Sequence, residues 1–115
     1  MRAASAAKLP AGCTPVIGNA LDADSFAAEV PPADTFVQLV GTPHPAPWKA
    51  RSFETVDLVA GKAGVDAASR AGVSHFIYVS VAQPAPVMRA YQRVRAAVEA
   101  HVQASGLAAT VLRPW

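Results

Sequence analysis

Two side chains near the end of the chain have the types and spacing that proton transfer requires. Tyr91 and Arg95 are four residues apart, so on a helix their side chains share one face. A cation beside a phenol favours the phenolate, which prepares a tyrosine to act as a general acid or base. Ser80 ends the preceding apolar run, where its hydroxyl can hold a carbonyl oxygen of a substrate. Ser80, Tyr91 and Arg95 are therefore the candidate catalytic residues.

A purely structural interpretation of the same pair stays open, and the spacing alone favours it. In that interpretation Tyr91 faces the core, and Arg95 is a solvated residue that pairs with Glu99. Metal chemistry is not indicated, because the three histidines do not have the spacing of metal ligands. Ser80 also lacks the glycine-flanked elbow of a hydrolase nucleophile.

Composition limits the classes of protein that the chain can represent. Its 115 residues suffice for one domain, and 52% hydrophobic against 16% charged residues argues against intrinsic disorder. The net charge of +2 includes no basic block, so we expect no nucleic-acid partner. We expect no membrane span, because no apolar run approaches the roughly 18–20 residues required. The single Cys13 excludes an internal disulfide, and a reducing, cytoplasmic setting is the default expectation.

Candidate elements alternate regularly along the chain. Apolar and β-branched runs predict strands at 14–18, 35–40, 74–81 and 109–112, and periodic patterns predict helices at 22–30, 53–71 and 88–105. Ser52 and Gly72 are the expected caps of the second helix, and proline loops are expected at 42–47 and 83–86. The run at 74–81 lacks alternation, which predicts burial on both faces. The order predicts an α/β fold with parallel crossovers.

Small and polar residues follow each expected strand, where ligands of open parallel sheets gather. These segments let a flat ligand approach the backbone, although they also suit ordinary turns; they are Gly18–Ala20, Val40–Thr42, Ser80–Ala82 and Arg113–Pro114.

Three longer segments carry a family resemblance. The runs Ala71–Ser80 (AGVSHFIYVS), Tyr91–Arg95 (YQRVR) and Ser105–Pro114 (SGLAATVLRP) resemble the short-chain dehydrogenase/reductase superfamily. The chain looks most like the extended or atypical members, the NAD-dependent epimerase/dehydratase or NmrA-like NAD(P)-binding proteins. The segment Gly18–Asp22 is similar to the one that meets the adenine, and Val40–Thr42 to the loop that passes the cofactor's ribose and diphosphate.

The resemblance implies a role for each matched residue and a cofactor, NAD or NADP. Ser80 would orient the substrate, Tyr91 would exchange the proton, and Arg95 would take the place of the family lysine. Five residues would contact the cofactor: Asn19, Ala20, Gly41, Thr42 and Pro114. In the intact parent, a hydride would pass between nicotinamide and a small organic substrate. The alternative is a non-catalytic nucleotide-binding or interaction module.

The sequence departs from the family pattern at three places. Arginine replaces the lysine of Tyr-x-x-x-Lys, Asn19 replaces an aspartate, and the glycine-rich phosphate turn is absent. We therefore expect residues 1–115 to be a single partial Rossmann-like domain that lacks the first two strands and the C-terminal substrate region. The segment at 14–18 would then pair directly with 35–40 or form a detached arm. Unpaired strand edges would favour self-association.

Overall fold

The computed structural model describes residues 1–82 and 88–114, which are built around a three-stranded parallel sheet. The strands are β1 (Thr35–Gln38), β2 (His75–Val79) and β3 (Ala109–Leu112), in the spatial order β1-β2-β3. Phe36 lies opposite Phe76 in the β1–β2 register. Both pairings are parallel, so the predicted α/β class is confirmed as a partial Rossmann-like arrangement.

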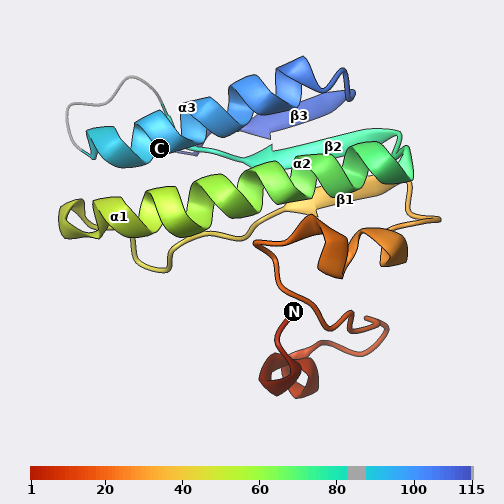
Figure 1. Ribbon diagram of the computed structural model, residues 1–115. Helices are drawn as coiled ribbons and strands as arrows, with labels where there is room; N and C mark the ends of the chain where they lie inside the picture. The colour runs from red at the N-terminus through yellow and green to blue at the C-terminus, as the bar shows by residue number, and fades with distance from the viewer. Residues whose placement is uncertain (83–87, 115) are drawn as a thin grey trace.

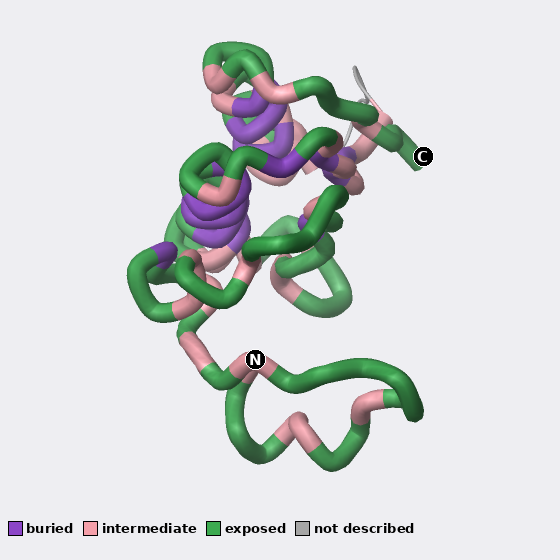
Figure 2. Tube along the Cα trace, turned by 90° about the vertical axis from the view of Figure 1, so that its right-hand side faces the viewer, coloured by how far each residue is buried: buried purple, intermediate pink, exposed green. Residues whose placement is uncertain are grey.

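Two helical crossovers join the strands. The first is one continuous helix made of α1 (Ala50–Ser52), the π-helical turns η5 (Phe53–Leu58) and α2 (Val59–Ala71); the second is α3 (Arg89–Ala104). Figures 1 and 2 show that α2 and α3 lie on the same face of the sheet. Within the described part of the chain, no helix has the length and apolar character to cross a membrane.

The sheet is consequently buried on one face only, which corrects the expectation for the run at 74–81. Phe76 and Tyr78 are 0% and 1% exposed beneath the helices, whereas alternate residues of β2 are half-buried. On the opposite face, Val37 of β1 and Leu112 of β3 are 50% and 49% exposed. The apolar run indicated a strand covered on both sides, but both crossovers pack on the same side.

The expected strand at 14–18 does not form, and this segment belongs to an arm of residues 1–20. The arm extends away from the sheet in Figure 1. It folds back on its own beginning, because the Gly18 N–H donates to the Met1 carbonyl at 3.0 Å and the Met1 ammonium to the Val16 carbonyl at 2.6 Å. Pro15 removes one of the donors a strand would need. Of the two expected outcomes, the detached arm is the one observed.

The expected helix at 22–30 is replaced by two single 3₁₀ turns, η2 (Ala23–Ser25) and η3 (Ala27–Glu29). The Ser25 hydroxyl bonds to the backbone carbonyls of Asn19 and Asp22, and the Asp22 carboxylate accepts from the Asp24 N–H at 3.1 Å. Such side-chain bonds to the local backbone compete with helix formation. Two further short 3₁₀ segments are η1 (Ala3–Lys8) and η4 (Pro47–Lys49).

The ends of the long crossover helix agree with the sequence at one terminus only. Gly72 has φ +66°, and its N–H bonds to the carbonyls of Ala68 and Ser69, as predicted for a left-handed cap. The helix begins at Ala50, and Ser52 makes no capping bond. The expected cap was wrong because the helical pattern continues backward into η4. The expected proline loop at 83–86 lies outside the described residues.

Two glycines inside α2 set how closely the layers approach. A Cβ added at Gly61 would lie 2.6 Å from a methyl group of Val98, so this glycine allows α2 and α3 to touch. A Cβ at Gly64 would collide with the Gln38 side chain, so this glycine lets α2 lie directly on β1. The core beneath them includes the parallel rings of Phe36 and Phe76, with centroids 5.5 Å apart.

Candidate active site

A crevice opens at the carboxyl ends of the strands, and its lining includes four of the residues singled out from the sequence. Its volume is about 320 Å³, and it is lined by Leu39, Pro45, Val79, Ser80, Val81, Tyr91, Arg95 and Pro114. The end of β2 supplies Ser80, α3 supplies Tyr91 and Arg95, and the segment after β3 supplies Pro114. The parallel sheet thus brings together candidate residues as far apart in the sequence as Ser80 and Pro114.

The Tyr91 ring lies between an aromatic ring and a guanidinium. Its centroid is 4.9 Å from that of Phe53, with the two planes 58° apart. Its second contact is with Arg95, whose Cζ is 4.9 Å from the Tyr91 centroid, within the range of a cation–π interaction. Phe53 is 1% exposed and therefore a fixed support. Contacts from two helices, η5 and α3, thus hold the orientation of the Tyr91 ring.

Arg95 is buried and bonded to protein groups. Its Nη2 donates to Asp57 Oδ2 at 3.0 Å, while Nη1 donates to the Val79 carbonyl at 3.0 Å and to the Tyr78 hydroxyl at 3.3 Å. The solvated Arg95–Glu99 pair of the structural interpretation is therefore wrong. Glu99 instead accepts two bonds from Arg113, at 3.1 and 2.6 Å.

Asp57 is the residue of this site that sequence reasoning missed. Its side chain has 0% exposure, and its Oδ1 accepts from both the N–H and the hydroxyl of Thr42, each at 2.7 Å. A spacing signal was available: Asp57 follows Phe53 by four residues and precedes Ala60 by three, so it belongs to the buried stripe of the helix. A carboxylate on such a stripe requires a partner, because an unpaired buried charge is costly.

The loop after β1 is tied to the same ion pair. A Cβ added at Gly41 would lie 2.5 Å from Arg95 Nη2 and 3.3 Å from Asp57 Oδ2. The absent side chain at Gly41 therefore makes room for the Asp57–Arg95 pair, while Thr42 binds its carboxylate. Asp57 lies in the π-helical turns of η5, a helix irregularity that occurs frequently at functional sites.

Around Arg95, burial and neighbouring charges shift side-chain pKa values in opposite directions. Burial raises the pKa of Tyr78 to about 12, although the Arg95 guanidinium opposes this shift. Burial lowers the pKa of Arg95, but Tyr78, Tyr91 and Asp57 together hold it above its usual value. Hydrogen bonds from Arg113 hold the pKa of Glu99 below its usual range. Arg95 therefore stays a cation, and Tyr78 stays a neutral phenol.

Asn19 and Ala20 lie in a separate groove. This groove has a volume of about 690 Å³, and its lining also includes Val40, which directly precedes Gly41. The Asn19 side-chain oxygen accepts from the Leu21 N–H at 3.0 Å, which leaves the amide nitrogen to act as a donor. The groove therefore reaches Val40, whereas the crevice is lined by the preceding residue, Leu39.

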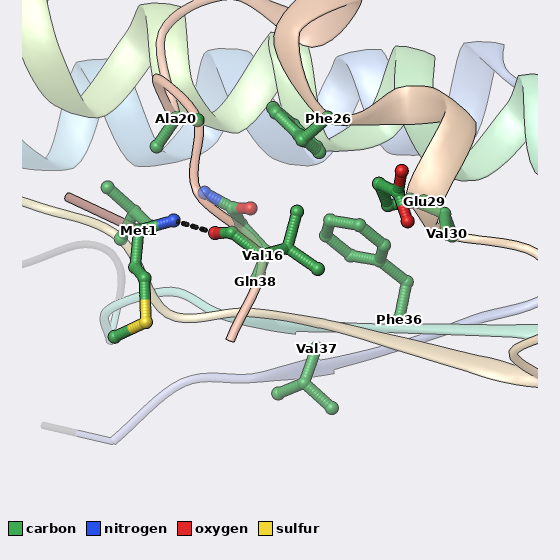
Figure 3. A pocket seen from close by; sticks show the side chains of 11 residues that line it. Met1, Val16, Ala20, Phe26, Glu29, Val30, Phe36, Val37 and Gln38 are labelled. Atoms are coloured by element: carbon green, nitrogen blue, oxygen red, sulfur yellow. Dashed lines mark hydrogen bonds between the residues drawn. The ribbon is translucent and has the colours of Figure 1, made fainter. Parts of the chain in front are cut away.

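A third cavity, at the free edge of β1, is apolar and shares no lining residue with the crevice. Its volume is about 210 Å³, and Figure 3 shows Phe26, Phe36 and Val16 around it. The candidate chemistry therefore lies at the carboxyl ends of the strands and not in this cavity.

Comparison with known protein families identifies the family to which this chain belongs. The family described as NAD(P)H-binding matches residues 1–115. The chain belongs to the NAD(P)H-binding family. This agrees with the expected NAD(P)-binding relationship, and it makes NAD or NADP the cofactor class. No curated protein sequence matches the chain significantly.

Solved structures share the fold of this NAD(P)H-binding domain. WbmH of Bordetella bronchiseptica, solved with NAD⁺, is similar with a TM-score of 0.70 and 20% identity over 85% of this chain and 39% of that one. WbmG of the same organism, solved with NAD, gives 0.73 and 20% over 90% and 38%. A mutated uronate dehydrogenase gives 0.58 and 16% over 80% and 40%. The domain thus spans about two fifths of these structures.

The NAD(P)H-binding domain offers space for the two ends of a dinucleotide. The crevice and the groove each have the volume of a small-ligand site. The crevice lining includes Leu39 and Pro45, and the groove lining includes Val40, so both lie near the segment after β1. The Thr42 hydroxyl donates to Asp57 but keeps an oxygen that accepts a bond from a ribose hydroxyl. The residues therefore fit the ends of the cofactor, whereas the glycine-rich turn that would hold its diphosphate is absent from the sequence.

Proposed function

We propose that residues 1–115 form a single partial domain contributing to an NAD(P)-dependent oxidoreductase or epimerase. The observation that supports this most is that Ser80, Tyr91 and Arg95 line one crevice at the carboxyl ends of the strands. When bound, the nicotinamide supplies or accepts a hydride. The protein must then hold the substrate oxygen and move its proton.

Each side chain of the crevice has a distinct task in this proposal. The Ser80 hydroxyl donates to the substrate oxygen and orients it, and the Tyr91 hydroxyl gives or takes the proton of that oxygen. Arg95 supplies the positive charge at the Tyr91 ring that the family lysine supplies elsewhere. Because its guanidinium is bonded to Asp57, Tyr78 and Val79, it acts through the ring of Tyr91 and not on the cofactor's ribose.

The cofactor contacts follow the order of the cavities along the strand ends. Asn19 and Ala20, which line the groove, would face the adenine, and Pro114, which lines the crevice, would border the nicotinamide. Gly41 and Thr42 are in the lining of neither cavity; in this proposal they contact the middle of the cofactor from the loop after β1. A preference between NAD and NADP is not part of this proposal.

A second candidate function is a nucleotide-binding or interaction module without catalysis. It is favoured by the bonds of Arg95, because a guanidinium held by three protein groups is a structural element rather than a mobile cation. Among the described residues, β1 has a partner strand on one side only, and its other edge adds a site for self-association. In either candidate function, we place the protein in the cytoplasm, among NAD-dependent epimerase/dehydratase or NmrA-like proteins, without a nucleic-acid partner.

Titration of the full chain with NADH and NADPH tests cofactor binding. Nucleotide fluorescence and amide chemical shifts should report saturation in the millimolar range, with the largest shifts at Asn19, Thr42 and Ser80. Shifts confined to the β1-edge cavity, or no shifts, would contradict the proposed site. Micromolar affinity would contradict the expectation that the diphosphate lacks its anchor.

Turnover separates the two candidate functions. The catalytic proposal expects oxidation of NADH with small carbonyl compounds in the intact parent, lost in Tyr91→Phe while binding is kept, whereas residues 1–115 alone are expected to be inactive. The non-catalytic proposal expects equal binding and no turnover in both proteins.

A further inference from the structure

We propose that Asp57 is a positioning residue that fixes the Tyr91 ring through Arg95. The inference deepens the proposed function and rests on it for its purpose, but its geometry is independent of cofactor binding.

The first step is the Asp57–Arg95 contact. Asp57 Oδ2 accepts from Arg95 Nη2 at 3.0 Å, and the two side chains are 0% and 8% exposed. An arginine so enclosed cannot turn away to water without leaving a buried carboxylate unpaired. The plane of its guanidinium is therefore set by the carboxylate and by the Val79 carbonyl, which accepts from Nη1 at 3.0 Å.

The second step is the contact of Arg95 with the reacting side chain. Arg95 Cζ is 4.9 Å from the Tyr91 ring centroid, and the Phe53 ring is also 4.9 Å from it. Tyr91 is only half-buried, so these two neighbours limit how its ring can rotate. Phe53 is one helical turn before Asp57. The same helical segment therefore supports Tyr91 directly through Phe53 and indirectly through Asp57.

The third step links this support to the loop after β1. Asp57 Oδ1 accepts from the Thr42 N–H and hydroxyl, each at 2.7 Å. One carboxylate thus holds both the loop after β1 and the cation against Tyr91. Arg95, which stands in place of the family lysine, and Asp57 on the facing helix therefore act together as one ion pair.

The test compares Asp57→Asn with Asp66→Asn in the full isotope-labelled chain. Asp66 is on the same helix, about half exposed and bonded to His101, so its removal changes the same charge away from Arg95. In the unchanged protein and in Asp66→Asn, we expect resolved Arg95 guanidinium proton signals and nuclear Overhauser effects from Arg95 to the Tyr91 ring. In Asp57→Asn we expect both to be lost, with a shift of the Thr42 amide.

A second variant keeps the test informative if Asp57→Asn does not fold. The double variant Asp57→Asn with Arg95→Gln removes both charges, so no unpaired ion remains buried. It should fold and show weaker Overhauser effects between Tyr91 and Phe53. Retention of the Tyr91 contacts at full intensity in either variant would overturn the proposal. Unfolding of both would also count against it, because the pair would then support the whole domain.

The effect of Asp57 on cofactor binding is measured separately. NADH-induced shifts at Ser80 should be lost or reduced in Asp57→Asn and unchanged in Asp66→Asn. If the unchanged chain binds no NADH, the proposed function fails, while the contacts measured without cofactor still decide the role of Asp57.

Discussion

Arg95 Nη2 donates to Asp57 Oδ2 across 3.0 Å in a place where neither side chain exceeds 8% exposure. This pair joins α3 to the crossover helix and, through Thr42, to the loop after β1. Its arginine also lines the crevice that contains Ser80 and Tyr91. The stability of the sheet edge and the geometry of the candidate site therefore depend on the same two charges.

Removing one charge of this pair should destabilise the domain strongly. Asp57→Asn leaves the Arg95 cation buried without its counter-charge, and the free energy of unfolding should fall by about 3 kcal/mol. Urea denaturation followed by circular dichroism measures this. Asp66→Asn, which breaks an exposed pair with His101, should cost less than about 1 kcal/mol. Equal losses of unfolding free energy in the two variants would contradict a larger contribution from the buried pair.

Closer packing of the two crossover helices should not be tolerated at Gly61. Gly61→Ala adds a methyl group 2.6 Å from a Val98 methyl, and we expect a loss of roughly 1–3 kcal/mol despite the better helix propensity of alanine. Val98→Ala in the same chain removes the collision. The two substitutions together should therefore cost less than the sum of their separate effects in thermal or urea unfolding. Strict additivity would contradict the close contact.

Tyr78 should make the domain sensitive to alkali. Burial raises its pKa to about 12 in the folded chain, against about 10 when unfolded, so the neutral phenol favours the folded state. This contribution is fully present below pH 10 and is lost as the pH rises to 12, by about 2 kcal/mol. Urea midpoints measured across this range should fall less steeply in Tyr78→Phe. An identical slope in both proteins would show that other groups carry the alkaline sensitivity.

Glu99 should contribute to the loss of folding stability at acidic pH. The hydrogen bonds from Arg113 lower its pKa, so the ionised form stabilises the folded chain. This stability is present above the unfolded pKa of about 4.5 and declines as the pH falls below it. Because Arg113 is 53% exposed and screened by water, the effect should stay below about 1 kcal/mol. Melting temperatures from pH 3 to 7 should depend less on pH in Glu99→Gln than in the matched variant of exposed Glu54, Glu54→Gln.

Local patterns in the sequence determined most of the fold. The strands at 35–38, 75–79 and 109–112, the two long helices and the cap at Gly72 all follow from periodicity and from residues within one helical turn. The gathering of Ser80, Tyr91 and Pro114 at one edge followed from parallel order. In contrast, the segment at 14–18 has strand-like residues, but no strand of the described residues lies beside it, and the residue pattern did not choose between direct pairing with 35–40 and a detached arm.

Only the tertiary structure decided what surrounds Arg95. Its partners come from positions 38 residues away, at Asp57, and 16 residues away, at Val79, and such pairings depend on how two helices pack on one face of the sheet. The sequence indicated a charged residue four positions after Tyr91, which suits either solvent or a site. Burial then made a carboxylate partner necessary, and Asp57 is the one that the packing brings within reach.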